Sequence, residues 1–395
     1  MSLLTDPAQR LQTALSAEAR ALPESGIVEV VKYGAGRPGL IPLWVGEGHL
    51  PTPDFIVAEA ARSMAAGETF YTEQRGLAEL RHALAKFHQR QFGGRFDPEM
   101  FHVTGSGMQA IQMAVRAVAT KGDEIVLPSP AWPNFPAAVR AQGAVPVEVP
   151  IDFGDKGWQL DIARLFDAVG PRTKAIFIIS PGNPTGWVMS QEEMAEVIAF
   201  ARARDLWLIA DEVYSRFYFG DGPSPSFWHE VEPGDKILFT NTFSKNWAMT
   251  GWRVGWIAAA PELGQVIENM IQYSTSGVAK FMQRACVTAL EEGEAFIAAQ
   301  VAQAIQGRQI VSEALSSSNR LRYASPDGGF YGFFGIAGEP HSRSLAFRLI
   351  DEIGIGVAPG SAFGPGGEGF VRICFQRDPA QLQDAMDRIA QWLRR

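Results

Sequence analysis

The chain has 395 residues, of which 46% are hydrophobic and 20% charged, a composition typical of folded globular proteins and not of disordered segments. Its formal net charge is −8, its pI is about 5.4, and it has no block of Lys and Arg, so the composition argues against nucleic acid as a partner. Its two cysteines, Cys286 and Cys374, are far apart and lack metal-type spacing, so neither a disulfide framework nor a metal site is expected.

The N-terminal sequence MSLLTDPAQRLQ lacks the basic start and apolar core of a secretion signal. No uninterrupted apolar run reaches membrane-spanning length. We therefore expect a soluble cytoplasmic protein that makes no contact with a membrane. The sequence LQTALSAEARAL, near the N-terminus, has a helical pattern, and we expect that helix to pack against the C-terminal part of the chain.

Between about Phe101 and Ala260, short apolar runs alternate with longer segments of helical period. This alternation is typical of a mostly parallel sheet that is covered by helices on both faces. The runs that we expect to form strands are Phe101 to Val103, Glu124 to Leu127, Ala175 to Ile179, Leu206 to Ala210, Ile237 to Phe239 and Trp256 to Ala259.

One helix between two of these strands has clear local signals. In SQEEMAEVIAFARARD, Ser190 and Glu193 have the spacing of a capping box, in which each residue caps a backbone N–H of the other. The apolar residues Met194, Val197, Ile198 and Ala201 recur at helical spacing and share one face. The pattern therefore predicts a helix that begins just after Ser190.

Turn and polar residues follow five of the predicted strands. In chain order they are GSG, PSPAWPN, SPGNPTG, DEVY and TFSK. In an open α/β sheet, ligands bind in the crevice outside the carboxyl ends of the strands, so these five loops are expected to converge on one site.

The chain changes character after about Cys286. Helical periods are followed by the glycine-rich stretches PDGGFYGFFGI and GVAPGSAFGPGGEGFVRICF, which suggest a smaller α+β unit. We therefore predict an α/β fold with a large domain at residues 46–285. Residues 1–45 and 286–395 are predicted to form the small domain together.

Lys245 lies among aromatic residues in TNTFSKNWAMTGWRVGW, just after a predicted strand. A typical lysine lies on a solvated face, but an ammonium beside aromatic surface is unfavourable unless it is compensated or chemically changed. An amine at a crevice can form an imine with an aldehyde, and a pyridoxal phosphate Schiff base is the commonest example.

Such a cofactor needs an acidic partner for its ring nitrogen, and Asp211 follows the predicted strand LWLIA. Tyr214 and Asn183 could bind the phenolic oxygen of the cofactor. Each residue also has an ordinary alternative: Asp211 as a helix cap or turn residue, Tyr214 as a packed tyrosine, and Asn183 as a turn residue.

A phosphate group needs backbone N–H groups and fixed cations. VTGSGMQA, which contains Ser106, Gly107 and Met108, is a glycine loop that opens a helix, and a helix N-terminus binds anions. Arg253, Thr242 and Ser244 could add a guanidinium and two hydroxyls, and Trp132 could offer a flat face to the ring, although each of these residue types often has only a structural role.

The same glycine loop also fits the dinucleotide fingerprint G-x-G-x-x-A, so a nicotinamide or flavin enzyme is an alternative. The expected acidic residue should close the next strand, whereas Asp123 and Glu124 open theirs. The chain has no P-loop, H-E-x-x-H or G-x-S-x-G motif, which leaves phosphotransfer, zinc hydrolysis and serine acyl transfer unsupported.

Arg372 lies inside the apolar run FVRICF. An isolated buried guanidinium is unfavourable, so Arg372 either pairs with a protein carboxylate or waits for an anionic ligand. Its planar fork suits a substrate carboxylate. The run itself favours neither alternative.

Taken together, these motifs resemble the class I and II aminotransferases, the aspartate aminotransferase superfamily of fold type I. The resemblance runs over nearly the whole chain, from LWVGEGHLPTPDF through FYTEQRGLAELR to PGSAFGPGGEGFVRICF. SPGNPTG, ADEVY and SKNWAMTGWRVGW occur in the order of the family.

The resemblance implies that pyridoxal 5'-phosphate is bound as an imine to Lys245 and that an amino group passes from an L-amino acid to a 2-oxo acid by ping-pong kinetics. It also implies a homodimer in which Tyr71 reaches the phosphate of the other subunit. The resemblance further implies that Asp211 binds the ring nitrogen, that Asn183 and Tyr214 bind the phenolic oxygen, and that Trp132 stacks on the ring. The other cofactor-binding residues, at the phosphate end, are Ser106, Gly107, Met108, Thr242, Ser244 and Arg253. Arg372 and the Gly46 backbone would hold the substrate carboxylate, beside Trp132 and Asn183.

Met108 departs from the pattern of acidic-substrate relatives, which often carry lysine at this place to pair with the distal carboxylate. Met108 therefore favours a broad or neutral donor, aromatic or aliphatic, with 2-oxoglutarate as a plausible acceptor. Arg37 or Arg75 could still supply the missing cation. The alternatives to an aminotransferase are a cystathionine β-lyase-like C–S lyase and a non-catalytic regulator built on the same fold.

Overall fold

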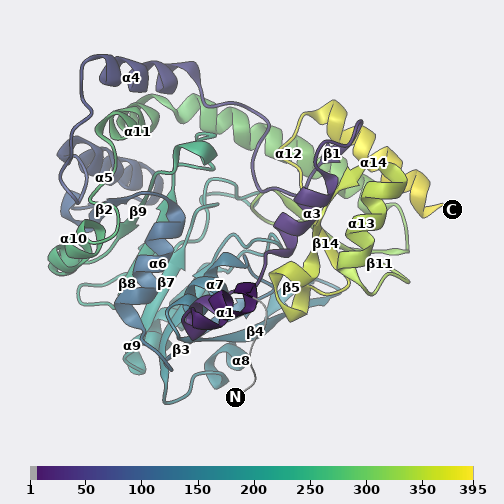
Figure 1. The fold of residues 1–395 in the computed structure, drawn as a ribbon, viewed down its shortest axis with the longest axis horizontal. Coiled ribbons are helices and arrows are strands. Elements are labelled where there is room, and N and C mark those ends of the chain that lie inside the picture. The colour runs from purple at the N-terminus through teal and green to yellow at the C-terminus, as the bar shows by residue number, and fades with distance from the viewer. Residues whose placement is uncertain (1–6, 395) are drawn as a thin grey trace.

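The computed structural model describes residues 7–394. Its largest element is an eight-stranded sheet in the order β2-β9-β8-β7-β6-β3-β4-β5 (Figure 1). Six strands run in one direction, while β5 and β9 pair antiparallel with their neighbours. The strands are β2 (Phe101–Thr104), β3 (Glu124–Ser129), β4 (Val145–Gly154), β5 (Gly157–Leu160), β6 (Thr173–Ile179), β7 (Trp207–Asp211), β8 (Ile237–Thr242) and β9 (Gly255–Ala258).

The six predicted strands are all present, and the mostly parallel sheet is confirmed. The sequence pattern missed the hairpin formed by β4 and β5. β4 lies next to the edge strand, only two of its 10 residues are buried, and it contains Pro146 and Pro150, which donate no hydrogen bond to a ladder. Its apolar signal is therefore weaker than that of the central strands.

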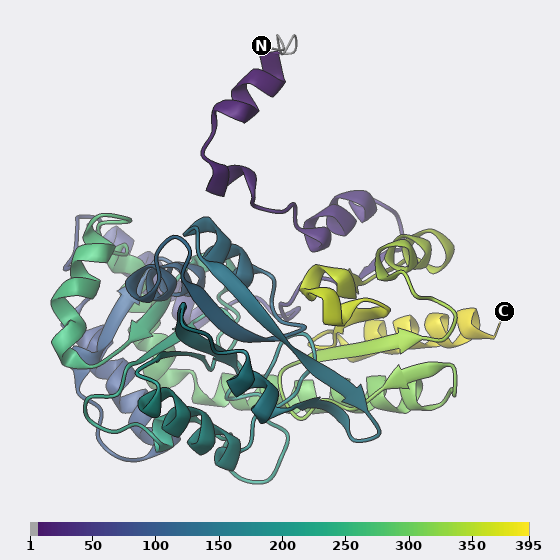
Figure 2. The ribbon, with the colours of Figure 1, turned by 90° about the horizontal axis from the view of Figure 1, so that it is seen from below.

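Helices cover both faces of this sheet. α6 connects β2 to β3 and α7 connects β3 to β4, and both connections lead toward β5 along the sheet. α9 connects β6 to β7 and leads in the opposite direction. Because such crossovers are right-handed, α6 and α7 lie on one face and α9 on the other, as Figure 2 shows. The helices of this part are α4 (Asp54–Ala65), α5 (Ala78–Phe92), α6 (Gly107–Val118), α7 (Asn134–Ala141), α8 (Ile162–Asp167), α9 (Gln191–Ala203), α10 (Gly264–Gln272) and α11 (Lys280–Glu292).

The predicted capping box begins α9. The Ser190 hydroxyl accepts a hydrogen bond from the Glu193 N–H at 3.2 Å, and the Glu193 carboxylate accepts one from the Ser190 N–H at 2.8 Å. The four apolar residues expected on the inner face of this helix are all buried. Helix start and buried face were thus both predictable from local spacing.

The smaller part of the molecule contains a four-stranded antiparallel sheet in the order β10-β11-β14-β13 and a short parallel pair of β1 and β12. This confirms a smaller α+β unit, while the domain bounds 46–285, and 1–45 with 286–395, stay a prediction. The elements are β1 (Ile41–Pro42), β10 (Leu321–Tyr323), β11 (Tyr331–Ile336), β12 (Ile355–Gly356), β13 (Ala358–Pro359), β14 (Phe370–Cys374), α3 (Gly26–Gly34), α12 (Glu294–Ser316), α13 (Ser342–Ile353) and α14 (Pro379–Leu393).

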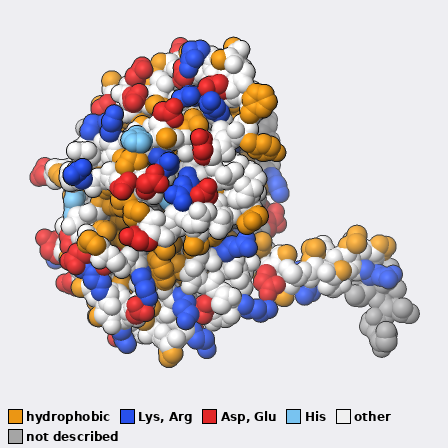
Figure 3. Space-filling view, turned by 90° about the vertical axis from the view of Figure 1, so that its left-hand side faces the viewer, with side chains coloured by type: hydrophobic (Ala, Val, Ile, Leu, Met, Phe, Trp, Pro, Cys, Tyr) orange, Lys and Arg blue, Asp and Glu red, His pale blue; other side chains and the backbone are white. Residues whose placement is uncertain are grey.

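The N-terminal segment differs from the expectation. LQTALSAEARAL does not form one helix. Ser16 has a non-helical backbone conformation and caps the short helix α2 (Ala17–Arg20), which is thereby separate from α1 (Pro7–Ala14). α1 projects away from the rest of the molecule (Figures 2 and 3), and Leu11 is 74% exposed. α2 lies by α7 of the large sheet, with a 2.8 Å ion pair between Glu18 and Lys121.

The expectation that this helix packs against the C-terminal part is therefore wrong, and only α3, further along, packs against α13. The first six residues of the predicted small domain lie outside the described residues. Within residues 7–394, no helix is long and apolar enough to cross a membrane.

Candidate active site

A cavity of about 560 Å³ opens at the carboxyl edge of the large sheet. The five loops that follow β2, β3, β6, β7 and β8 all contribute to its lining, together with residues of α3, β11 and β14. The predicted site residues that line it are Gly46, Gly107, Met108, Trp132, Asn183, Asp211, Tyr214, Thr242, Ser244, Lys245, Arg253 and Arg372.

Two predicted residues do not line this cavity. The Ser106 hydroxyl is turned to its own helix and accepts a hydrogen bond from the Gln109 N–H at 3.0 Å, which caps α6. Tyr71 is 92% exposed on the surface of the chain. Ser106 therefore acts in this structure as a helix cap, and Tyr71 does not reach the cavity of its own subunit.

Lys245 lies three residues beyond the end of β8, between the fully buried side chains of Phe243 and Trp247. Its Nζ donates a hydrogen bond to the Gly46 carbonyl at 2.6 Å. Removal from water disfavours the ammonium and lowers the pKa of Lys245 to about 8. A useful fraction of this amine is therefore neutral near physiological pH.

Asp211 ends β7 and is buried, and its Oδ1 accepts a hydrogen bond from the Val213 N–H at 3.1 Å. Burial raises the pKa of Asp211 to about 7, although the nearby Lys245 charge acts in the opposite direction. A carboxylate in this position would be stabilised by a cation placed beside it in the cavity.

Arg372 on β14 is 2% exposed, and its Nη1 donates to the Asn183 Oδ1 at 3.0 Å. Its Nη2 donates to the Trp44 carbonyl, and its Nε is buried without a partner. Within the described chain, no carboxylate pairs with Arg372. Of the two roles left open by the sequence, this geometry favours an anionic ligand. Asn183 contacts Arg372 through its side-chain oxygen, so this contact does not use the amide N–H groups of Asn183.

Tyr331 on β11 was missed by the sequence analysis. Its hydroxyl forms a 2.7 Å hydrogen bond with the Tyr214 hydroxyl, and the Arg372 guanidinium lies 4.5 Å from the centre of its ring. A side chain on Gly46 would collide with the Tyr331 hydroxyl. The only signal in the sequence is an aromatic residue within a glycine-rich strand, which does not indicate contact with Tyr214.

The cavity lining includes a tight cradle at the N-terminus of α6. A Cβ added to Gly107 would lie 3.0 Å from the Thr242 Cβ, and one added to Gly255 would lie 2.5 Å from the Gly107 nitrogen. The first N–H groups of α6 have no partner within the helix and favour an anion there. Thr242 and Ser244, whose hydroxyls are 2.9 Å apart, and Arg253 also line the cavity.

These groups fit pyridoxal 5'-phosphate by their chemistry. The cavity is lined by an anion cradle, by a buried carboxylate suited to a protonated ring nitrogen and by an amine of lowered pKa. The residues therefore match the cofactor that the resemblance implied.

A further part of the cavity lining, called here the substrate wall, comes from residues that sequence reasoning missed. Ser25, which caps α3, and Ile27, Val28 and Val31 of α3 are more than 200 residues from Lys245 in the chain, and Ile111 of α6 and Asn134 of α7 also line the cavity. Nothing local in the sequence places α3 over this cavity.

The two arginines considered as extra cations lie elsewhere. Arg37 pairs with Asp351, and Arg75 pairs with Glu268 at 2.6 Å and with Glu99 at 3.0 Å. Neither lines the cavity. Within one chain, Arg37 and Arg75 therefore do not supply the missing cation.

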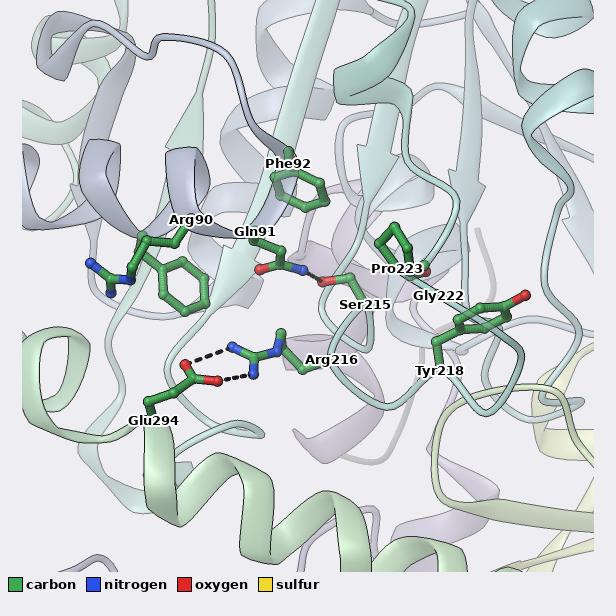
Figure 4. Close-up of a pocket in the computed structure, with 11 residues that line it drawn as sticks. Arg90, Gln91, Phe92, Ser215, Arg216, Tyr218, Gly222, Pro223 and Glu294 are labelled. Atoms are coloured by element: carbon green, nitrogen blue, oxygen red, sulfur yellow. Dashed lines mark hydrogen bonds and ion pairs between the residues drawn. The ribbon is translucent and has the colours of Figure 1, made fainter.

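A second cavity, of about 460 Å³, lies behind the loop that carries Tyr214 (Figure 4). Its polar groups pair with one another: Gln91 donates to the Ser215 hydroxyl at 2.8 Å, and Arg216 forms a two-pronged ion pair with Glu294. These contacts tie the segment next to Tyr214 to α5 and α12.

The large sheet, the smaller α+β unit and the site at their carboxyl edge define a fold type I pyridoxal phosphate enzyme. The family described as aminotransferase class I and II matches residues 40–389, and the chain belongs to that family. It is an aminotransferase, and its cofactor is pyridoxal 5'-phosphate.

Its relatives cover nearly the whole chain. A probable aspartate/prephenate aminotransferase of Aquifex aeolicus is 34% identical over 385 residues, which are 95% of this chain and 93% of the relative. An arginine–pyruvate transaminase of Pseudomonas aeruginosa is 34% identical over 352 residues, 88% of each protein. The solved aspartate aminotransferase of Thermotoga maritima has a TM-score of 0.90 at 30% identity and covers 96% of this chain and 100% of its own.

These matches favour amino-group transfer over the C–S lyase, the non-catalytic regulator and the nicotinamide enzyme. The names of two of these relatives print aspartate and that of the third prints arginine, so the names alone do not select a donor for this chain.

Proposed function

We propose that this protein moves an amino group from an L-amino acid to a 2-oxo acid in two half-reactions, with Lys245 as the residue that carries the cofactor and serves as the base. The observation that supports this most strongly is the meeting of the Lys245 amine, the buried Asp211 carboxylate and the α6 cradle in one cavity. When bound, pyridoxal 5'-phosphate supplies an aldehyde and a cationic ring that draws electron density from the substrate α-carbon.

The protein's own groups hold and orient the cofactor. Asp211 would accept a hydrogen bond from the ring nitrogen and keep it protonated, because a buried carboxylate stabilises an adjacent cation. The α6 N-terminus, Thr242, Ser244 and Arg253 bind the phosphate. Asn183 and Tyr214 would donate to the phenolic oxygen, and Trp132 would offer its ring to the cofactor.

Lys245 moves the substrate α-proton. With its pKa near 8, the free amine can accept a proton at neutral pH and return it without a large energetic mismatch. Its 2.6 Å hydrogen bond to the Gly46 carbonyl gives the amine a fixed position at the cavity edge. The same amine serves both half-reactions, which supports ping-pong kinetics.

Arg372 binds the substrate α-carboxylate. Its guanidinium donates hydrogen bonds to the Asn183 side chain and the Trp44 carbonyl and packs against the Tyr331 ring. Its orientation is therefore set before the substrate binds. The buried, unpartnered Nε offers one further donor.

An apolar or aromatic donor fits the substrate wall best. Ile27, Val28 and Val31 of α3 and Met108 of α6 are apolar and line the cavity. The basic residues of the lining are Lys245, Arg253 and Arg372, which already have other roles here. A distal carboxylate would therefore lack a partner within one subunit. 2-Oxoglutarate stays a prediction for the acceptor.

We further propose a homodimer with shared active sites. Phe70, Tyr71 and Tyr273 are 82%, 92% and 86% exposed, and Thr72 donates to the Val278 carbonyl at 3.1 Å, which links the two segments that carry them. Large exposed aromatic side chains near one another are typical of interaction surfaces. Tyr71 would then reach the phosphate of the partner's site. A cytoplasmic location fits the two buried free thiols.

Borohydride reduction followed by peptide mass spectrometry tests the role of Lys245. We expect a phosphopyridoxyl adduct on the peptide that contains Lys245 and on no other lysine peptide. Lys245→Ala should lower turnover by about a thousandfold or more, since it removes the general base. Near-normal activity of this variant would refute the assignment.

The donor is identified by adding single amino acids to the yellow protein and recording which of them bleach the visible absorbance of the cofactor. Bleaching by leucine or phenylalanine with no 2-oxo acid present, and recovery on adding one, is expected. Release of pyruvate and ammonia without an acceptor would instead indicate the C–S lyase.

A further inference from the structure

The segment between β1 and α4 contacts both ends of the turn that follows Lys245. Thr52 donates its hydroxyl proton to the Ala248 carbonyl at 2.7 Å, and the same oxygen accepts a hydrogen bond from the Trp252 indole N–H at 2.9 Å. One side chain, 196 residues away in the sequence from Ala248, thus spans a turn that ends at Arg253.

This turn is in an unfavourable backbone conformation without outside support. Ala248 has a φ of +52° and Arg253 a φ of +55°, a region that non-glycine residues adopt only when their surroundings hold them there. Among the described residues, only three other non-glycine positions have a positive φ. The two constrained residues enclose the short 3₁₀ helix Thr250–Trp252.

A second contact from the same segment supports this view. The Thr250 hydroxyl donates to the Glu47 carboxylate at 2.9 Å, and the Thr250 carbonyl accepts from the Arg253 Nη1 at 2.6 Å. The direction of the Arg253 guanidinium therefore depends on where Thr250 and Trp252 lie. Both of these residues are tied to the 47–52 segment.

Thr52 itself does not line the cavity, whereas Arg253 and Thr250 do. Any influence of Thr52 on a ligand in the cavity must therefore pass through the turn. Its hydroxyl uses both its donor and an acceptor position on that turn, which a side chain without a hydroxyl cannot reproduce.

We propose that Thr52 is a positioning residue that holds the 248–253 turn in shape and thereby aims Arg253 at the cofactor phosphate. This inference rests on the proposed role of Arg253 as a phosphate ligand. Thr52 then contributes to binding the phosphate without touching it.

The test compares two ligands of the cofactor-free protein: pyridoxal phosphate, and pyridoxal, which lacks the phosphate. Thr52→Val keeps the size of the side chain and removes both hydrogen bonds. We expect it to weaken pyridoxal phosphate about tenfold and to change pyridoxal affinity by less than about twofold, because only the phosphate end loses its aligned guanidinium. Thr52→Ser should restore wild-type binding.

A double-mutant cycle shows whether Thr52 acts through Arg253. Arg253→Gln should weaken pyridoxal phosphate by itself, and adding Thr52→Val to it should cause little further loss. Equal weakening of both ligands by Thr52→Val, full additivity in the cycle, or wild-type binding by Thr52→Val would each overturn the proposal.

The cycle also separates this inference from the function on which it rests. If Arg253→Gln weakens binding and Thr52→Val does not, only the role of Thr52 fails. If Arg253→Gln leaves pyridoxal phosphate binding unchanged, the assigned role of Arg253 fails and the role of Thr52 fails with it. Melting temperatures report folding, and if Thr52→Val does not fold, Trp252→Phe removes one of the same hydrogen bonds and is interpreted in the same way.

Discussion

The Asp211 carboxylate is buried at the end of β7, and burial raises its pKa to about 7. In the cofactor-free protein, the folded chain therefore holds this proton more tightly than the unfolded chain does. The contribution of Asp211 to folding consequently becomes less favourable as the pH rises from about 4 to about 7, and the full penalty is present above that range. The total is roughly 4 kcal/mol at most.

Asp211→Asn should therefore raise the melting temperature of the cofactor-free protein at pH 8 and have less effect at pH 5. Turnover of the cofactor-loaded enzyme should fall at least about a hundredfold, because the ring nitrogen loses its charged partner. The exposed Asp155→Asn is the control, with unchanged melting at both pH values. A variant that is less stable at pH 8 than at pH 5, relative to wild type, would contradict this account.

Met108 lies in the first turn of α6 and lines the cavity, whose basic residues, Lys245, Arg253 and Arg372, have other proposed roles. Met108→Lys should raise kcat/KM for aspartate relative to that for an apolar donor by about tenfold or more, since a charge-assisted hydrogen bond stabilises by about 1.5–3 kcal/mol. Met108→Leu, which keeps an apolar side chain, should leave the ratio nearly unchanged. An unchanged ratio in Met108→Lys would place the donor side chain elsewhere.

At the scale of elements, the site depends on how closely α6 approaches β8 and β9. A methyl group on Gly255 would lie 2.5 Å from the Gly107 nitrogen and 2.7 Å from the Asn241 carbonyl oxygen. All of these atoms belong to the backbone, so the clash cannot be relieved by turning a side chain. The anion cradle exists because β9 carries no side chain at this position.

Gly255→Ala should lower the free energy of unfolding by about 1–3 kcal/mol and also weaken pyridoxal phosphate binding, because α6 must shift. Gly251→Ala is a matched control in the neighbouring turn, where an added Cβ meets nothing within 4 Å. Urea unfolding and cofactor titration of both variants provide the measurement. Equal effects of the two substitutions would show that the close approach is unimportant.

Elements with consecutive local signals were predictable, and those without them were not. The start and buried face of α9 follow from Ser190, Glu193 and apolar spacing. β4 was missed because few of its side chains are buried, and β5 because it is only 4 residues long and gives too short an apolar run. α1 has a helical pattern, but that pattern carries no information about which surface a helix contacts.

At the scale of the whole molecule, two buried histidines connect folding to pH. His88 and His102 are 2% and 0% exposed, and burial lowers the pKa of each to about 4. Arg75 and Arg81 reinforce this for His102, and Glu99 opposes it. The unfolded chain takes up these protons first, so the stabilisation is complete above pH 6.5 and is lost as the pH falls toward 4.

His102→Phe should therefore reduce the loss of unfolding free energy between pH 7 and pH 5 by about 2 kcal/mol, as followed by urea unfolding. Within residues 7–394, neither ring nitrogen of His102 makes a hydrogen bond of normal geometry, so the substitution breaks at most a weak contact with the Met100 backbone. The exposed His82→Phe should leave the pH dependence unchanged. If the unfolding free energy of both variants depends on pH as it does in the wild type, His102 is excluded as a source of acid sensitivity.

Shared active sites can be tested by mixing two defective subunits. In a hybrid of Lys245→Ala and Tyr71→Ala chains, one site has both defects and the other combines an intact Lys245 with the partner's intact Tyr71. Random exchange of equal amounts should then restore about a quarter of wild-type activity, since half the dimers are hybrids with one intact site each. No recovery after verified subunit exchange would refute the shared site.

The amino-acid sequence by itself determined six of the eight strands of the large sheet, the convergence of five of its loops and the presence of Lys245, Asp211 and Arg372. These features depend on apolar runs, on turn residues next to them and on the rule that parallel strands end at one edge. Each signal is contained within a few consecutive residues.

Only the tertiary structure decided which distant groups meet. It brought Tyr331 to Tyr214, placed α3 over the substrate wall, tied Thr52 to the turn before Arg253, and paired Arg37 and Arg75 with carboxylates away from the cavity. Contacts between side chains hundreds of residues apart depend on how whole elements pack against one another. No local pattern of residues records that packing.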